Sequence, residues 1–189
     1  MRIPVMNLAD IFRLVMVGLI TCFIACQHDP RPARTTSHIR MLDEQVIRYN
    51  QGIIRTEEQE ITDFIRRYRW EMKRTSTGLR YMIYYTGSGK AAVKGMQASV
   101  RFTLRLLNGQ QIYSSDSAGL KEITLGYSGV ETGLEEGLLH LHQGDRAKFI
   151  IPSYLAFGLL GDQHKIPPGA TLVYDLELVD LKIPGNGNP

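Results

Sequence analysis

The sequence lacks the residues that most small catalytic and nucleic-acid-binding domains depend on. It holds two cysteines and one tryptophan among 189 residues, and its 22 basic and 19 acidic residues are interspersed. No long basic run of the kind that binds nucleic acid is present, so we expect no nucleic-acid partner. No G-x-S-x-G or Walker-type loop occurs either, which argues against a serine hydrolase and a P-loop nucleotide site.

The histidines and paired acids do not form a recognisable chemical site. His140 and His142 are two positions apart, so on a helix they point to different sides and do not resemble a metal pair. Glu135 and Glu136 are adjacent at a predicted helix start, where negative charge is stabilising, and a structural role is the simpler interpretation. We therefore expect no metal and no cofactor.

The start of the chain reads as an export signal. Arg2 and Arg13 flank a polar start, and the apolar run 14–24 is too short for a lasting bilayer span. Phe23-Ile24-Ala25-Cys26 resembles a bacterial lipobox, which predicts a signal peptide over 1–25 and a lipid on Cys26. Cys22 is a competing site, with Thr21 a poorer residue than Ala25 before the cleaved bond. A plain signal peptide and an uncleaved anchor are the alternatives.

Two amphipathic helices are predicted beyond a tether over 26–37. Apolar residues recur at helical spacing from Ile39 to Tyr49, and the stretch 50–52 offers a stop. Thr56 and Gln59 have capping-box spacing and are expected to open the second helix. The helical segment is assigned to 38–74, and its basic end suits either the helix dipole or phospholipid headgroups. These helices could pack on the following domain or form the interface of a dimer, and the sequence does not decide between the two.

The remainder, 75–183, has the pattern of an antiparallel sheet, followed by a tail over 184–189. Val100, Phe102 and Leu104 alternate with polar residues, Asn108-Gly109 signals a hairpin, and similar alternation recurs in 147–151 and 172–178. A single short helix, predicted from the apolar residues after Thr132, would cover the apolar face. The fold class is therefore α+β, with one antiparallel sheet wrapped on a short helix.

One stretch, residues 126–137 (GYSGVETGLEEG), organises this domain. Thr132 and Glu135 have capping-box spacing, so a helix is expected to start there, and the amides just before it lack intrahelical partners. The Glu131 N–H is thus a candidate donor to a substrate carbonyl. Together with A-F-G at 156–158 and I-P-P-G-A-T-L-V-Y-D at 166–175, this stretch resembles the FKBP family of peptidyl-prolyl isomerases, over about residues 79–183.

The resemblance implies an apolar pocket and assigns its residues. The positions that match the family's catalytic set are Phe102, Tyr113, Glu131, Phe157 and Tyr174, and those that match its substrate-binding set are Ile112, Val130, Leu134 and Ile166. Several positions depart from the family pattern. Phe102 stands for a tyrosine, Ile112 and Tyr174 for phenylalanines, and Glu131 for an isoleucine, although its backbone donor survives. Tyr113 replaces a carboxylate, Phe157 replaces a tyrosine and Leu134 replaces a tryptophan, so weakened isomerase activity is expected. A core role for Ile112 and Val130 is an equal alternative.

The function implied is a prolyl isomerase that assists folding of envelope proteins, lipid-anchored at Cys26 and facing the periplasm. Proline-containing polypeptides would be its clients. The order of lipobox, tether, helices and domain is also similar to FKBP-type lipoproteins associated with gliding motility. The alternative is therefore a binding or scaffold lipoprotein of an envelope assembly, whose pocket holds a partner without turnover.

Overall fold

The computed structural model describes residues 36–127 and 129–183, and its chain divides into two compact units, 1–49 and 50–189. The predicted signal peptide, Cys26, most of the predicted tether and the tail 184–189 lie outside the described residues. Among the residues that are described, no helix is both long enough and apolar enough to cross a membrane.

The helical segment is one helix, α2 (Thr36–Tyr68), and the predicted break at 50–52 is wrong. The Thr56 hydroxyl donates to the carbonyl of Gly52 at 3.1 Å, one turn back, instead of capping a new helix. The helix ends at Tyr68, six residues before the predicted end, in a Schellman motif. Arg69 takes the left-handed conformation (φ 55°) and Trp70 N–H donates to Ile65 O at 3.2 Å.

The sheet confirms the predicted α+β class. Its strands are β1 (Lys73–Arg74), β2 (Arg80–Tyr85), β3 (Gln97–Leu106), β4 (Gln111–Ser114), β5 (Lys121–Thr124), β6 (Arg146–Ile151) and β7 (Leu172–Lys182). All pairings are antiparallel, in the order β1-β2-β6-β7-β3-β4, with β5 also paired to β3. The C-terminal strand β7 therefore lies in the middle of the sheet, between β6 and β3.

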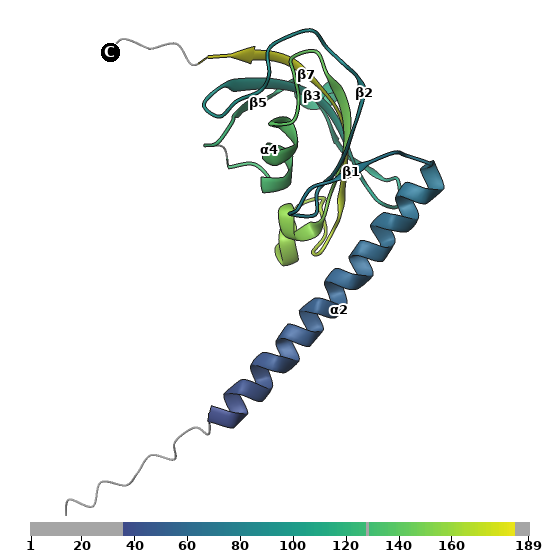
Figure 1. The fold of residues 1–189 in the computed structure, drawn as a ribbon, viewed down its shortest axis with the longest axis vertical. Helices are drawn as coiled ribbons and strands as arrows, with labels where there is room; N and C mark the ends of the chain where they lie inside the picture. The colour runs from purple at the N-terminus through teal and green to yellow at the C-terminus, as the bar shows by residue number, and fades with distance from the viewer. Residues whose placement is uncertain (1–35, 128, 184–189) are drawn as a thin grey trace, which may run out of the picture. The chain divides into compact units, whose positions relative to one another are not determined.

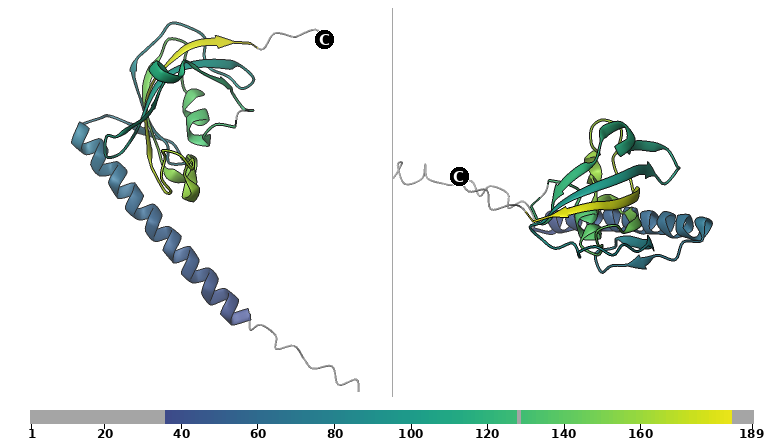
Figure 2. Two further views of the ribbon diagram at one scale, coloured as in Figure 1. Left: turned by 180° about the vertical axis from the view of Figure 1, so that it is seen from behind. Right: turned by 90° about the horizontal axis from the view of Figure 1, so that it is seen from above.

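Helix α4 (Thr132–Leu138) lies within the curve of the sheet, as the views in Figures 1 and 2 agree. Its Leu134 and Leu138 are buried against the inward residues of the strands. Gly137 allows this close approach, because a Cβ there would lie 2.4 Å from the Phe149 ring. The tight packing fixes the helix start, and with it residue 131, relative to the sheet.

The outer face of the sheet is covered at one end by α2. Ile61 and Phe64 are buried against Ile150 of β6 and Val173 of β7, and Trp70 packs beside them. This part of α2 belongs to the same compact unit as the sheet. Residues 57–72 thus pack on the domain, which the sequence left open.

Three short elements border the inner face: α3 (Ser115–Ala118), η1 (Ser153–Leu155) and η2 (Gly158–Leu160). Ser114 is the N-cap of α3. The Ser114 hydroxyl caps it by accepting a hydrogen bond from Asp116 N–H at 3.1 Å.

Candidate active site

A cavity of about 310 Å³ opens on the inner face of the sheet, and we call it the inner cavity. Strands β3, β4 and β7 form its base, and the α3–β5 connection, residue 131 and the loop after η1 form its walls. Its lining is mostly apolar and consists of Phe102, Leu104, Tyr113, Ala118, Gly119, Leu120, Lys121, Glu131, Phe157, Ile166 and Tyr174. A cavity of this size and character suits an apolar ring or side chain.

Six of the nine predicted site residues line the inner cavity: Phe102, Tyr113, Glu131, Phe157, Ile166 and Tyr174. The other three do not. Ile112 and Leu134 are buried core residues, at 6% and 1% exposure, and Val130 packs against the same core. Leu134 belongs to the buried core as part of helix α4, so the position matching the family's tryptophan contributes packing here.

The Glu131 side chain turns inward and joins a polar chain. The Tyr174 hydroxyl donates to Glu131 Oε1 at 2.7 Å, and Lys121 Nζ lies 3.3 Å from Glu131 Oε2. Tyr174 is 1% exposed and Glu131 6% exposed. Burial, together with the neighbouring Glu131 charge, raises the pKa of the Tyr174 hydroxyl well above its usual value. The phenol therefore stays protonated and serves as the donor that holds this carboxylate.

A second phenol and carboxylate pair lies on another wall of the cavity. The Tyr113 hydroxyl donates to Asp162 Oδ2 at 2.5 Å, and Asp162 Oδ1 accepts the N–H groups of His164, Lys165 and Ile166 at 2.7–2.9 Å. Partial burial raises the pKa of Asp162, but these hydrogen bonds outweigh that effect and lower it to about 2. Asp162 thereby fixes two lining residues, Tyr113 and Ile166.

Glu131 lines the inner cavity, and its N–H is the predicted donor to a ligand. Glu131 is the N-cap of α4, and its carbonyl accepts from Leu134 and Glu135, while its N–H has no acceptor among the described residues. The predicted capping box does not form, since Glu135 Oε1 instead accepts the Gly126 N–H at 2.5 Å. The helix start is thus correctly placed to within a residue, but no side chain caps the N-cap residue Glu131.

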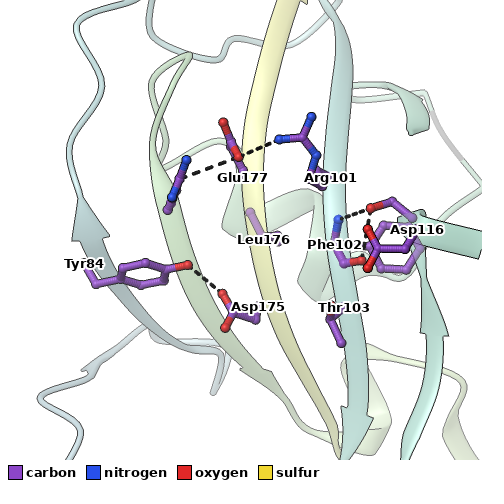
Figure 3. A pocket seen from close by; sticks show the side chains of 10 residues that line it. Tyr84, Arg101, Phe102, Thr103, Asp116, Asp175, Leu176 and Glu177 are labelled. Atoms are coloured by element: carbon purple, nitrogen blue, oxygen red, sulfur yellow. Dashed lines mark hydrogen bonds and ion pairs between the residues drawn. The ribbon is translucent and has the colours of Figure 1, made fainter. Parts of the chain in front are cut away.

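A larger cavity of about 360 Å³, the outer cavity, lies on the other face of the sheet (Figure 3). Most of its charged groups pair with one another: Glu177 lies 3.0 Å from Arg101 and 3.6 Å from Arg146, and the Tyr84 hydroxyl donates to Asp175 at 2.7 Å. A ligand there would have to break these pairs. Within residues 36–127 and 129–183, no group of three or more His, Cys, Asp or Glu is placed to hold a metal ion.

The predicted site residues do not include five that line the inner cavity, namely Leu104, Ala118, Gly119, Leu120 and Lys121, nor Asp162, which holds the lining residue Tyr113 from outside the lining. Lys121 stands two positions before the buried Ile123 in β5, so period-two alternation places both on the inner face and could have identified Lys121. Asp162 lies in an irregular loop. Its contact with Tyr113 joins residues distant in the chain, and no local pattern predicts such a contact.

Comparison with known proteins gives consistent results. Residues 88–179 match the FKBP-type peptidyl-prolyl cis-trans isomerase family. An FK506-binding protein of Neisseria meningitidis serogroup A is 40% identical over 96 residues, which are 50% of this chain and 88% of that protein. The probable isomerase FkpA of N. meningitidis serogroup B is 38% identical over 115 residues, and Escherichia coli FkpA is 35% identical over 111 residues. The matched parts span only 42% and 40% of those two proteins.

Two crystal structures resemble this fold. Escherichia coli FkpA superposes with a TM-score of 0.61 at 24% identity, covering 91% of this chain and 83% of that one. AtFKBP13 gives a TM-score of 0.57 at 27% identity, covering 60% of this chain and 100% of that one.

Proposed function

The chain belongs to the FKBP-type peptidyl-prolyl cis-trans isomerase family, and we propose from this that its inner cavity catalyses cis–trans isomerisation of X-Pro bonds. The observation that supports the proposal is the juxtaposition of an apolar cavity with the Glu131 N–H at its wall. The cavity would take the proline ring, and the N–H would orient the carbonyl of the peptide bond.

This chemistry needs neither a nucleophile nor a metal. Amide resonance opposes rotation with a barrier of about 18–20 kcal/mol, and the twisted amide at the top of that barrier has lost resonance. An apolar wall made of Phe102, Phe157 and Ile166 favours the less polar twisted state by excluding water. A fixed backbone donor costs no reorganisation at that moment.

We expect the turnover to be lower than in family members with the consensus pocket. Phe157 carries no hydroxyl, and the hydroxyls of Tyr113 and Tyr174 already donate to Asp162 and Glu131. The loss of one hydrogen bond to the substrate is worth about 0.5–1.5 kcal/mol, or up to roughly tenfold in rate.

We also propose that the protein acts in the cell envelope, lipid-anchored at Cys26 and facing the periplasm, with unfolded proline-containing proteins as clients. The support is the sequence of residues 1–26, with its short apolar run and lipobox-like Phe23-Ile24-Ala25-Cys26. Incorporation of radiolabelled palmitate, abolished by Cys26→Ala and unaffected by Cys22→Ala, tests the anchor. Label that persists in Cys26→Ala would refute it.

The isomerase proposal is tested by measuring cis-to-trans exchange of Leu-Pro and Phe-Pro peptides. Phe157→Asp places a charge in the wall of the cavity and should abolish catalysis. Leu159→Asp is the matched control, because Leu159 is 69% exposed and does not line the cavity. Background rates for the unaltered protein at high concentration, or equal loss in both variants, would count against the assignment.

A second function, a binding module without turnover, is favoured by one observation: both tyrosine hydroxyls of the cavity donate to protein carboxylates. Phe157→Tyr distinguishes the two functions by restoring a free hydroxyl. Faster exchange in this variant supports a weakened enzyme. Peptide binding with no gain in exchange supports the binding module. Tyr113→Asp is a poorer test, because it would place a second carboxylate beside Asp162.

A further inference from the structure

A buried glutamate of helix α2 reaches the loop that forms one wall of the inner cavity. Glu57 is 7% exposed, and Glu57 Oε1 accepts both the Ser153 N–H and the Thr171 hydroxyl, each at 2.5 Å. Glu57 Oε2 accepts the Ser153 hydroxyl at 3.0 Å. Ser153 and Thr171 are themselves buried, at 7% and 5% exposure. One carboxylate therefore uses three donors from two distant points of the chain.

The two points are the roots of one excursion, residues 153–171, which we call the pocket loop. Strands β6 and β7 pair up to Ile151 and Leu172, and the chain leaves the sheet directly beyond that pair. Ser153 begins the loop and Thr171 ends it. Glu57 thus accepts hydrogen bonds from both roots, at the point where the β6–β7 pairing ends.

The pocket loop carries much of the cavity's geometry. Phe157 and Ile166 line the cavity, and Asp162 holds the Tyr113 ring. The loop is braced internally, with Gly169 N–H donating to Gly158 O at 2.8 Å. A loop that is rigid within itself moves as a body about its roots, so a displacement at the roots carries Phe157 and Ile166 with it.

We propose that Glu57 is a positioning residue for the isomerase site: through it, helix α2 fixes the roots of the pocket loop and so the wall of the cavity. Helix α2 is then a functional part of the isomerase domain, although residue 57 lies outside the matched region 88–179. The neighbouring Glu58 has a different task, since it pairs with Arg80 and Arg74.

The experiment compares three variants of the full chain. Glu57→Ala removes all three acceptor contacts. Glu57→Gln keeps them in altered form, because its carbonyl oxygen can accept from the Ser153 N–H and the Thr171 hydroxyl while its amide donates to the Ser153 hydroxyl. Ile61→Ala is the control for stability: it loosens the packing of α2 on Ile150 and Val173 without touching the pocket loop.

Two readouts are taken at 10 °C, where each variant is verified as folded by circular dichroism. The first is kcat/KM for an X-Pro peptide, expected to fall about fivefold to tenfold in Glu57→Ala, by less than twofold in Glu57→Gln, and little in Ile61→Ala. The second is amide hydrogen exchange, expected to quicken about tenfold in Glu57→Ala alone for the amides of Leu155 and Ala156, whose hydrogen bonds to Pro152 O and Ser153 O close the turn at the first root of the pocket loop. Amides of the β3–β7 ladder serve as the internal reference.

Only the kinetic readout rests on the proposed function. Faster exchange in the pocket loop of Glu57→Ala, with no isomerase activity in any variant, would support the role of Glu57 and refute the enzyme. Equal losses of kcat/KM in Glu57→Ala and Ile61→Ala would overturn the proposal, because stability alone would then explain both. Unchanged exchange in Glu57→Ala would overturn it as well.

Discussion

The pair formed by Tyr174 and Glu131 gives a sharp test of the site's energetics. Tyr174→Phe removes one hydroxyl from a side chain that is 1% exposed and leaves Glu131 Oε1 without its donor. A hydrogen bond to a charged group is worth about 1.5–3 kcal/mol, and a buried acceptor left unsatisfied keeps its full desolvation cost. We expect a loss of about 2 kcal/mol, or roughly 4–8 °C in Tm for a domain of this size.

A double-mutant cycle isolates the pair. Glu131→Leu leaves the buried Tyr174 hydroxyl unsatisfied and should cost about 1–3 kcal/mol. It does not disturb the start of α4, because the Glu131 side chain makes no capping hydrogen bond. Removing both partners should be nearly neutral, since Lys121, with 30% of its side chain exposed, can then be solvated. Because the double variant should lose almost nothing while the two single losses together reach about 3–5 kcal/mol, we expect urea unfolding to give a coupling of about that size.

Tyr84→Phe is the matched control. Its hydroxyl also donates to a carboxylate at 2.7 Å, that of Asp175, but Tyr84 is 48% exposed. The loss there should stay below about 1 kcal/mol, because water replaces the hydroxyl. A coupling below about 0.5 kcal/mol between positions 131 and 174, or equal losses in Tyr84→Phe and Tyr174→Phe, would refute the reasoning from burial.

Further predictions concern alkaline and acid pH and the glycines of two helices. The pKa of Tyr174 is raised in the folded state, so the stability that its hydroxyl contributes is complete below the unfolded pKa of about 10 and is lost as the pH rises through the folded value. Above pH 10 the urea midpoint of unfolding should therefore fall less steeply with pH in Tyr174→Phe than in the unaltered protein. For Asp162 the folded pKa is lowered to about 2 from 3.8, so its hydrogen bonds are complete above about pH 4 and are lost as the pH falls through about 2. The Ile166 amide proton shift should titrate there by NMR, and a flat response would contradict the assignment; Asp162→Asn should remove the titration. Gly137→Ala should destabilise the fold by about 1–3 kcal/mol, because its Cβ would lie 2.4 Å from the Phe149 ring. In α2, the Cβ of Gly52→Ala would meet nothing within 4 Å, so the higher helix propensity of alanine should stabilise the fold by up to about 1 kcal/mol. If urea unfolding showed that both glycine variants change the free energy of unfolding in the same direction, packing around the added Cβ would not decide the outcome.

The sheet and its covering helix could be predicted from the sequence because their signals are local. Alternation of buried and exposed residues in β3 and β7, the turn at Asn108-Gly109 and the apolar stripe of α4 each depend on neighbours in the chain. The family resemblance then brought six of the nine named residues to one cavity. Local pattern and motif together thus determine most of the framework.

What the sequence did not reveal depends on contacts between distant residues. Asn50-Gln51-Gly52 reads as a stop, yet α2 continues through it, because packing of Ile61 and Phe64 on the sheet stabilises a helix whose interior glycine costs only about 1 kcal/mol. No periodic pattern in the sequence predicts contacts between residues so far apart in the chain. Examples are the contacts of Glu57 with Ser153 and Thr171, and the contact of Tyr113 with Asp162.

The central position of β7 has a consequence for how the chain acquires its fold. Strand β7 follows the other six described strands in the chain, yet it pairs with β3 along its whole length on one side and with β6 through residues 172–177 on the other. Until residues 172–182 are available, β3 and β6 have no neighbour to join them, and the apolar faces that they carry cannot be buried together. Contacts between such distant parts of the chain make folding slow, so we expect the sheet to stay open until the segment of β7 is present. In this topology a C-terminal segment, and not an early one, joins the two halves of the sheet.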